Sequence, residues 1–173
     1  MTGETLVRRL RPDEWPAFRE LRLAALRTDP LAFGSTASRE AAYPDEKWQD
    51  WALRGSTGSR EATFVATVQS GPWVGMAGAF RKDERFHLWG MWVHPSWRGQ
   101  GIGRDLLDAL LLWLDERFPG SGVLLDVNPD QVSAVRTYLA RGFRFNGVEQ
   151  PLGHDPPAVT RQMIRGLVRA EVA

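Results

Sequence analysis

The stretch from Phe86 to Arg104 places the strongest limits on what this chain can fold into. It begins with an apolar, aromatic run that predicts a buried strand, continues through Pro, Ser, Arg and Gly residues, and leads into a Leu-rich helical pattern. The expected order is therefore strand, glycine-rich turn, helix. Such a turn directs the unpaired N–H groups at a helix start into one concavity, with the positive end of the helix dipole behind them. A concavity of this kind binds phosphate.

The glycines of this turn suit a phosphate because they leave the main chain open. Gly99, Gly101 and Gly103 lack the Cβ atoms that would keep a diphosphate away, and Arg98 and Arg104 add positive charge on either side. Alternate glycines also occur in ordinary loops between a strand and a helix, so the glycines alone leave that structural interpretation open.

Two common nucleotide motifs do not match the turn. A Walker A loop requires Lys followed by Ser or Thr after its last Gly, whereas Arg104 and Asp105 follow here. A dinucleotide fingerprint requires Gly in the sixth position of Gly-x-Gly-x-x-Gly, which Arg104 occupies. Asp126 imitates the ribose-binding acid of that fingerprint, but too little chain follows it for the further βαβ units of a doubly wound fold.

The pattern Arg98-x-x-Gly101-x-Gly103 resembles the motif with which the GNAT (GCN5-related) N-acetyltransferase superfamily holds the diphosphate of acetyl-coenzyme A. The flanking residues are similar to that family's consensus as well, in Val93-His94-Pro95 and Leu106-Leu107. A second resemblance lies in the stretch from Asn128 to Tyr138 with the following Gly142-Phe143. Gln131 departs from it, because the family usually has Asn there.

The resemblance implies an α/β (α+β) fold in which about four helices flank a mixed, mostly antiparallel sheet of about seven strands. It implies one domain over residues 1–173 and acetyl-CoA as the cosubstrate. It also implies that the strand ending at Val93 diverges from the strand ending at Val127, which frees backbone groups of Met91 and Val93 for the pantetheine. The residues expected to bind the coenzyme are Met91, Trp92, Val93, Arg98, Gly99, Gln100, Gly101, Ile102, Gly103, Arg104, Asn128, Gln131 and Ser133.

Local patterns along the chain predict the order β, α, α, β, β, β, α, β, α, β, β. In the N-terminal half they predict a strand at 5–9, helices at 12–27 and 44–55, loops at 31–43 and 55–60, and strands at 62–68 and 73–80. After the strand that begins at Phe86 they predict a helix at 102–118, a strand at 123–127, a helix with Asn128 as N-cap, and strands at 143–148 and 159–164 around a Pro-rich loop.

Tyr138 is the candidate proton donor for the thiolate that leaves during acetyl transfer. A phenol with a reference pKa of about 10 can donate to a thiolate whose pKa is about 8.5. The position of Tyr138 in the helix motif carries this assignment, because an isolated tyrosine at helical spacing is more often a core residue.

His87 is the candidate general base, since an unperturbed histidine pKa of about 6.5 suits the deprotonation of an amine. Strand alternation predicts that His87 shares a face with Trp89, Met91 and Val93. A structural role beside the charged turn at 81–85 is the favoured alternative, and Glu84 is a weaker candidate base.

Composition excludes several other functions. A net charge of +1, from 22 basic and 21 acidic residues, provides no field for nucleic acid or an anionic membrane. The absence of Cys excludes disulfides and a cysteine nucleophile, and without paired His spacing no metal site is expected. No signal-peptide pattern or membrane-length apolar run occurs, so a cytoplasmic protein is predicted.

We therefore expect an N-acetyltransferase that moves an acetyl group directly from acetyl-CoA to an amine, because no Cys can carry the acyl group. The acceptor is a small molecule or a protein, and the resemblance is compatible with a homodimer. Acceptor specificity is expected to lie in the N-terminal helices and the loop near His154. Two alternatives stay open at this point: a non-catalytic acyl-CoA-binding module on the same fold, and a nucleotide-dependent dehydrogenase.

Overall fold

A seven-stranded sheet in the order β1-β2-β3-β4-β5-β7-β6 forms the centre of the protein. The computed structural model describes residues 3–166. All neighbouring strands are antiparallel except β4 and β5, which confirms the expected mixed, mostly antiparallel sheet. The strands are β1 (Thr5–Arg9), β2 (Glu61–Val68), β3 (Trp73–Lys82), β4 (Arg85–Val93), β5 (Val123–Val127), β6 (Arg144–Leu152) and β7 (Asp155–Arg165). The helices are α1 (Trp15–Thr28), α2 (Ala37–Ala41), α3 (Asp45–Thr57), α4 (Ile102–Arg117) and α5 (Val132–Leu139), with short 3-10 turns at η1 (Pro12–Glu14), η2 (Pro30–Ala32) and η3 (Pro95–Trp97).

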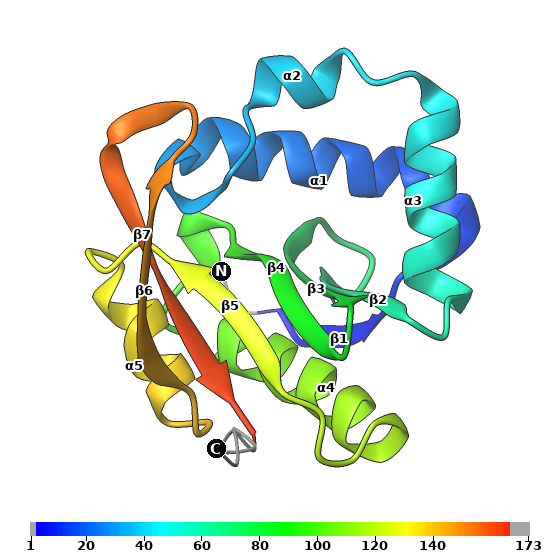
Figure 1. The fold of residues 1–173 in the computed structure, drawn as a ribbon. Helices are drawn as coiled ribbons and strands as arrows, with labels where there is room; N and C mark the ends of the chain where they lie inside the picture. Colours follow the sequence, from blue (N-terminus) through cyan, green and yellow to red (C-terminus); the bar gives the residue numbers. More distant parts are fainter. Residues whose placement is uncertain (1–2, 167–173) are drawn as a thin grey trace.

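Helices cover both faces of the sheet (Figure 1). On one face α1 and α3 place Phe18, Leu26 and Trp48 against Val65 and Met76 of the sheet. On the other face α4 and α5 pack against the strands with a separate apolar cluster, which includes Ala62, Phe86, Leu106, Leu110 and Tyr138. Two cores therefore sandwich the sheet, and the strands between them are buried on both sides.

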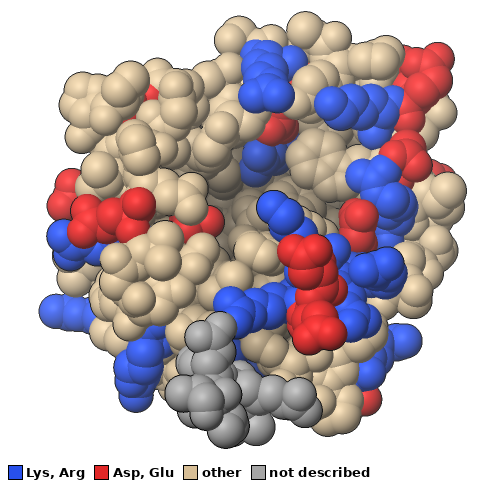
Figure 2. Space-filling model, in the orientation of Figure 1, with Lys and Arg blue, Asp and Glu red and all other residues tan. Residues whose placement is uncertain are grey.

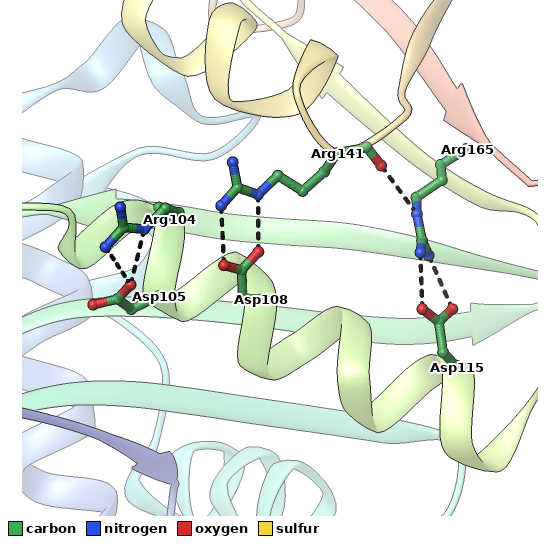
Figure 3. A network of polar contacts seen from close by, with 6 residues as sticks. All are labelled: Arg104, Asp105, Asp108, Asp115, Arg141 and Arg165. Atoms are coloured by element: carbon green, nitrogen blue, oxygen red, sulfur yellow. Dashed lines mark hydrogen bonds and ion pairs between the residues drawn. The ribbon is translucent and has the colours of Figure 1, made fainter.

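The two sides of α4 make different kinds of contact. Its leucines recur at helical spacing and are buried against the sheet, as the sequence predicts. Its outer side carries three aspartates that pair with arginines, namely Asp105 with Arg104, Asp108 with Arg141 and Asp115 with Arg165 (Figure 3). Because Arg141 follows α5 and Arg165 ends β7, two of these pairs attach α5 and β7 to α4.

Two predictions for the N-terminal half are wrong. The expected loop at 31–43 contains α2, which begins where the Thr36 hydroxyl accepts a hydrogen bond from the Arg39 N–H at 3.3 Å. Gly55 does not end α3, which continues to Thr57. Gly55 lies inside the helix, where a Cβ atom would come within 2.4 Å of the Thr63 hydroxyl oxygen. Glycine is thus required for the close approach of α3 to β2.

Two predictions for the C-terminal half are also wrong. Asn128 is not an N-cap: its side-chain oxygen accepts from the Asp130 N–H at 3.0 Å in a local turn, and α5 begins only at Val132. The expected Pro-rich loop is part of a long β6–β7 hairpin with a tight turn at residues 153–154. Its prolines are tolerated in β7 because they precede the part of that strand that pairs with β5, which starts at Arg161.

A buried ion pair joins α1 to α2. The Arg22 guanidinium donates to both Glu40 carboxylate oxygens at 2.9 and 2.8 Å, and the two residues are only 6% and 3% exposed. The guanidinium also lies over the ring of Phe33 at 4.8 Å from its centroid. The pair fixes the position of the short helix α2, whose own length is too small to hold it in place.

We expect Glu40→Gln to lower the free energy of unfolding by about 3 kcal/mol or more, because it leaves a buried Arg22 without its counter-charge. Urea unfolding measures this loss. The matched control is Asp45→Asn, which breaks an exposed pair with Arg19 and should cost under about 1 kcal/mol. Similar losses in the two variants would contradict a special contribution of the buried pair.

Candidate active site

The parallel pair β4–β5 is joined only where both strands begin. Phe86 lies opposite Val123 and His87 opposite Leu124, and the pairing stops there although both strands continue. Beyond His87, the edge of β4 that faces β5 therefore offers backbone groups that no strand uses. This is the divergence that the family resemblance implies.

A bulge in β4 lies within the divergent part. Gly78 pairs with Trp89 and Met76 with Trp92, so two β4 residues stand opposite one residue of β3. One of the two is Gly90, whose φ of +66° requires glycine. The bulge decides which β4 side chains face the cleft.

The expectation that His87 shares a face with Met91 and Val93 is wrong because of this bulge. Trp89 packs in the cluster under α1 and α3, whereas Met91 and Val93 pack against the cluster under α4 and α5. Alternation before the bulge places His87 on the face of Trp89. The additional residue then moves every second side chain after it, including Met91 and Val93, to the opposite face of the sheet.

His87 lines a shallow pocket at the β3–β4 turn, apart from the main cleft. The other lining residues are Lys82, Asp83, Glu84, Arg85 and Leu124, so the weaker candidate Glu84 lies there too. Burial lowers the pKa of His87, Lys82 and Arg85 lower it further, and Asp126 and Asp83 oppose the change. The structure thus brings neither candidate base to the residues around Tyr138.

The main cleft has a volume of about 540 Å³ and is formed by the end of α1, the divergent part of β4, the glycine-rich turn, the start of α4, and α5. Figure 2 shows that this face is hollowed near its centre, with basic and acidic side chains at the rim. Twelve of the fifteen predicted site residues line the cleft: Met91, Trp92, Val93, Arg98, Gly99, Gly101, Ile102, Gly103, Arg104, Gln131, Ser133 and Tyr138. Gln100, Asn128 and His87 are not among its lining residues.

The glycine-rich turn has the geometry that the sequence predicts. Gly101 adopts a φ of +84° directly before α4. The first N–H of α4 to bond within the helix is that of Asp105, which donates to the Gly101 carbonyl at 3.0 Å. The N–H groups of Ile102, Gly103 and Arg104 precede it at the positive end of the helix dipole. A diphosphate fits this group of donors.

Arg98 makes two contacts within the protein. Its Nε donates to the Val93 carbonyl at 2.9 Å, and its Nη2 donates to Asp29 Oδ2 at 2.5 Å. The Val93 carbonyl, expected to be free for pantetheine, therefore already accepts a hydrogen bond. The same Asp29 oxygen accepts from the Trp92 indole at 2.6 Å. Sequence analysis missed Asp29, since the Asp29-Pro30 pair indicates only the end of a helix.

Tyr138 lies on α5 and is 6% exposed. Its ring packs edge-to-face on Phe143, with 5.8 Å between the ring centroids. The hydroxyl makes no hydrogen bond to any residue from 3 to 166, so it is available to a group in the cleft. Burial raises the pKa of the phenol above its ordinary value, so Tyr138 stays protonated at neutral pH and can act as a donor.

The two segments expected to govern acceptor specificity meet at one point. His154, at the tip of the β6–β7 hairpin, places Nε2 2.8 Å from the carbonyl oxygen of Phe33, between α1 and α2. Within residues 3–166, no helix is long and apolar enough to cross a membrane, and no group of three or more His, Cys, Asp or Glu side chains could hold a metal ion.

Residues 10–143 match the family model described as "Acetyltransferase (GNAT) family". This chain belongs to the GNAT acetyltransferase family. The expected family is thereby confirmed, on a match that contains the glycine-rich turn, α5 and Tyr138.

Relatives of this GNAT chain include enzymes with different acceptors in their names. It is 30% identical over 66 residues to spermine/spermidine N(1)-acetyltransferase of Bacillus subtilis, a match that covers 38% of this chain and 43% of the relative. The match thus spans less than half the length of that relative. It is 26% identical over 137 residues to N-alpha-acetyltransferase RimI of Mycobacterium tuberculosis, covering 71% of this chain and 84% of RimI.

Solved structures confirm the GNAT fold. A GNAT-family acetyltransferase from Streptococcus pneumoniae superposes with a TM-score of 0.78 at 18% identity, over 95% of this chain and all of the other. The putative acetyltransferase yncA from Salmonella typhimurium, whose structure contains its cofactor acetyl-CoA, superposes with a TM-score of 0.72 at 18% identity, over 95% of each chain.

The turn predicts opposite outcomes for two glycine substitutions. Gly101→Ala should lower the free energy of unfolding by about 1 kcal/mol or more, because its positive φ disfavours a side chain and the new Cβ would lie 2.9 Å from the Arg104 guanidinium. Gly103→Ala should be neutral or stabilising, because its Cβ would meet only Val93 at an ordinary 3.6 Å and alanine favours helix. Urea unfolding of both variants tests this, and equal effects would refute it.

The lowered pKa of His87 predicts a pH dependence of stability. Between the folded pKa and the unfolded value of about 6.5, the unfolded chain binds more protons than the folded one, so stability falls as pH falls through this range. His87→Gln removes this contribution. Urea unfolding at pH 7.5 and 5.0 should show a smaller decrease for the variant than for the wild type, and an identical decrease in both would contradict the lowered pKa.

Proposed function

We propose that this protein transfers the acetyl group of acetyl-CoA directly to an amine acceptor. One observation carries the proposal: a single cleft is lined both by a glycine-rich helix start suited to a diphosphate and by the available, protonated hydroxyl of Tyr138. Binding the diphosphate at the turn orients the thioester along β4. Tyr138 then donates a proton to the sulfur of the leaving coenzyme A.

The cleft offers a separate set of groups to each part of the coenzyme. The N–H groups at the start of α4 and the guanidinium groups of Arg98 and Arg104 would hold the diphosphate. The unpaired backbone edge of β4 at Met91 would hold the pantetheine. Gln131, directly before α5, and Ser133, on α5, also line the cleft. Gln100 and Asn128 are not among the cleft-lining residues, so our proposal gives their side chains no contact with the coenzyme.

The residues around the cleft can stabilise the negative charge that forms on the thioester oxygen and can protonate the sulfur that leaves. A backbone N–H of β4 near Met91 can stabilise negative charge on the carbonyl oxygen, an effect worth roughly 3 kcal/mol in comparable sites. As the new C–N bond forms and the C–S bond breaks, Tyr138 gives its proton to the sulfur. The proton of the amine passes to water, because no histidine lines the cleft among the described residues and Asp29 already accepts from two donors.

The acceptor would reach the cleft beside the contact between His154 and Phe33. The relatives named for polyamines and for protein N-termini define the amines to test first. A suitable panel contains spermine, spermidine and a short peptide with a free N-terminus, with release of free coenzyme A thiol as the readout.

Tyr138→Phe should lower kcat about 10²-fold with an active amine, since it removes the proton donor and keeps the ring packing. The affinity for acetyl-CoA, measured by calorimetry, should stay near that of the wild type. Tyr43→Phe is the matched control: it removes the hydroxyl of the chain's other tyrosine, which does not line the cleft, and should leave kcat unchanged. An unchanged kcat for Tyr138→Phe would refute the role of Tyr138.

The same measurements separate the two alternative functions. A non-catalytic acyl-CoA-binding module would bind acetyl-CoA but release no thiol with any amine of the panel. A nucleotide-dependent dehydrogenase would show a higher melting temperature with NAD and no change with acetyl-CoA. Ligand binding stabilises the folded state by mass action, so a thermal-shift comparison of the two ligands distinguishes these functions before any activity is found.

A further inference from the structure

Asp29 holds the guanidinium of Arg98 on the wall of the cleft. The 2.5 Å contact from Arg98 Nη2 to Asp29 Oδ2 joins two residues 69 positions apart, and the 2.9 Å contact from Arg98 Nε to the Val93 carbonyl fixes the plane of the guanidinium. Both acceptors belong to residues that line the cleft, and the Val93 carbonyl lies on the strand along which pantetheine would run. The same side chain is also the arginine of the phosphate-binding motif, so one guanidinium has two possible anionic partners.

Asp29 stands at an unfavourable place for a carboxylate. It is the C-cap of α1, with its N–H donating to the Ala25 carbonyl at 2.9 Å, so its negative charge lies at the negative end of the helix dipole. The arginine and indole donors compensate for this position. Among the described residues that line the cleft, Asp29 is also the only acid. Its charge is therefore the one that opposes an anionic ligand from within the cleft.

The contact is weak enough for a phosphate to replace it. The side chains of Arg98 and Asp29 are 47% and 24% exposed, and partly exposed ion pairs of this kind contribute little net free energy because water screens them. A diphosphate can bind a guanidinium through two charge-assisted hydrogen bonds, whereas Asp29 receives only one from Arg98. Exchange of Arg98 from the carboxylate to a diphosphate is thus favoured.

We propose that Asp29 is a positioning residue that competes with the diphosphate of the coenzyme for Arg98 and thereby sets coenzyme affinity. In one arrangement Arg98 contacts Asp29 and the Val93 carbonyl. In the other, Arg98 contacts the diphosphate, and the Val93 carbonyl becomes available to the pantetheine. The inference rests on the proposed placement of the diphosphate at the glycine-rich turn.

Asp29→Asn tests the competition because the amide oxygen can still accept from Trp92 and Arg98 but carries no charge. We expect the Kd for acetyl-CoA, measured by calorimetry at low ionic strength, to decrease about 3- to 5-fold. The Kd for acetyl-pantetheine, which has the thioester but no diphosphate, should not change. In steady-state assays with an active amine, KM for acetyl-CoA should fall without a rise in kcat. Asp29→Ser, a second uncharged variant, should behave in the same way.

Two further substitutions isolate the contribution of Arg98. Asp29→Asn should have no effect on coenzyme binding in an Arg98→Gln background, because the competition needs the guanidinium. Asp45→Asn removes an acid that pairs with Arg19 and does not line the cleft, so it measures the general effect of one negative charge fewer and should leave the Kd for acetyl-CoA unchanged. Weaker or unchanged coenzyme binding in Asp29→Asn, or a gain that persists without Arg98, overturns the inference.

The outcome also separates this inference from the proposed function. If Arg98→Gln alone binds acetyl-CoA as tightly as the wild type, the placement of the diphosphate beside Arg98 is wrong. If Arg98→Gln weakens binding while Asp29→Asn does not strengthen it, the placement stands and only the competition fails. Urea unfolding of each variant confirms that it is folded under the assay conditions.

Discussion

The early end of the pairing between β4 and β5 determines most of what this molecule can do. Two residue pairs join the strands, and beyond them each strand continues with an unused backbone edge. In the interior of a sheet such edges are normally saturated, because buried N–H and C=O groups without partners are costly. Here the Val93 carbonyl accepts from an arginine side chain instead of a strand, and the edge of β4 beyond His87 opens into the cleft.

The elements around this opening are held in place from outside it. The Arg141–Asp108 and Arg165–Asp115 pairs attach α5 and β7 to the outer side of α4, whose leucine side is buried in the sheet. The Arg22–Glu40 pair holds α2 over the opposite face. Within the cleft, Asp29 joins the end of α1 to β4 and to the glycine-rich turn through its contacts with Trp92 and Arg98.

Sequence reasoning succeeded where local chemistry decides the structure. The glycine-rich turn and the leucines of α4 are specified by residues that are neighbours in the chain, so their positions could be predicted. The effect of the bulge at Gly90 depends on the register with β3, which no local pattern reveals. Strand alternation alone therefore correctly places His87 with Trp89 but wrongly adds Met91 and Val93, which lie on the other face. Asp29 was missed because its partner, Arg98, is 69 residues away.

The contact between His154 and the main chain at Phe33 tolerates substitution better than the glycine-rich turn does. The hairpin requires only a carbonyl oxygen at this point, and every residue type provides one. Side chains around Phe33 can therefore be exchanged during evolution while the hairpin stays in contact, whereas Gly101 admits few alternatives at its positive φ. A protein built in this way can change the side chains beside the hairpin without changing the glycine-rich turn.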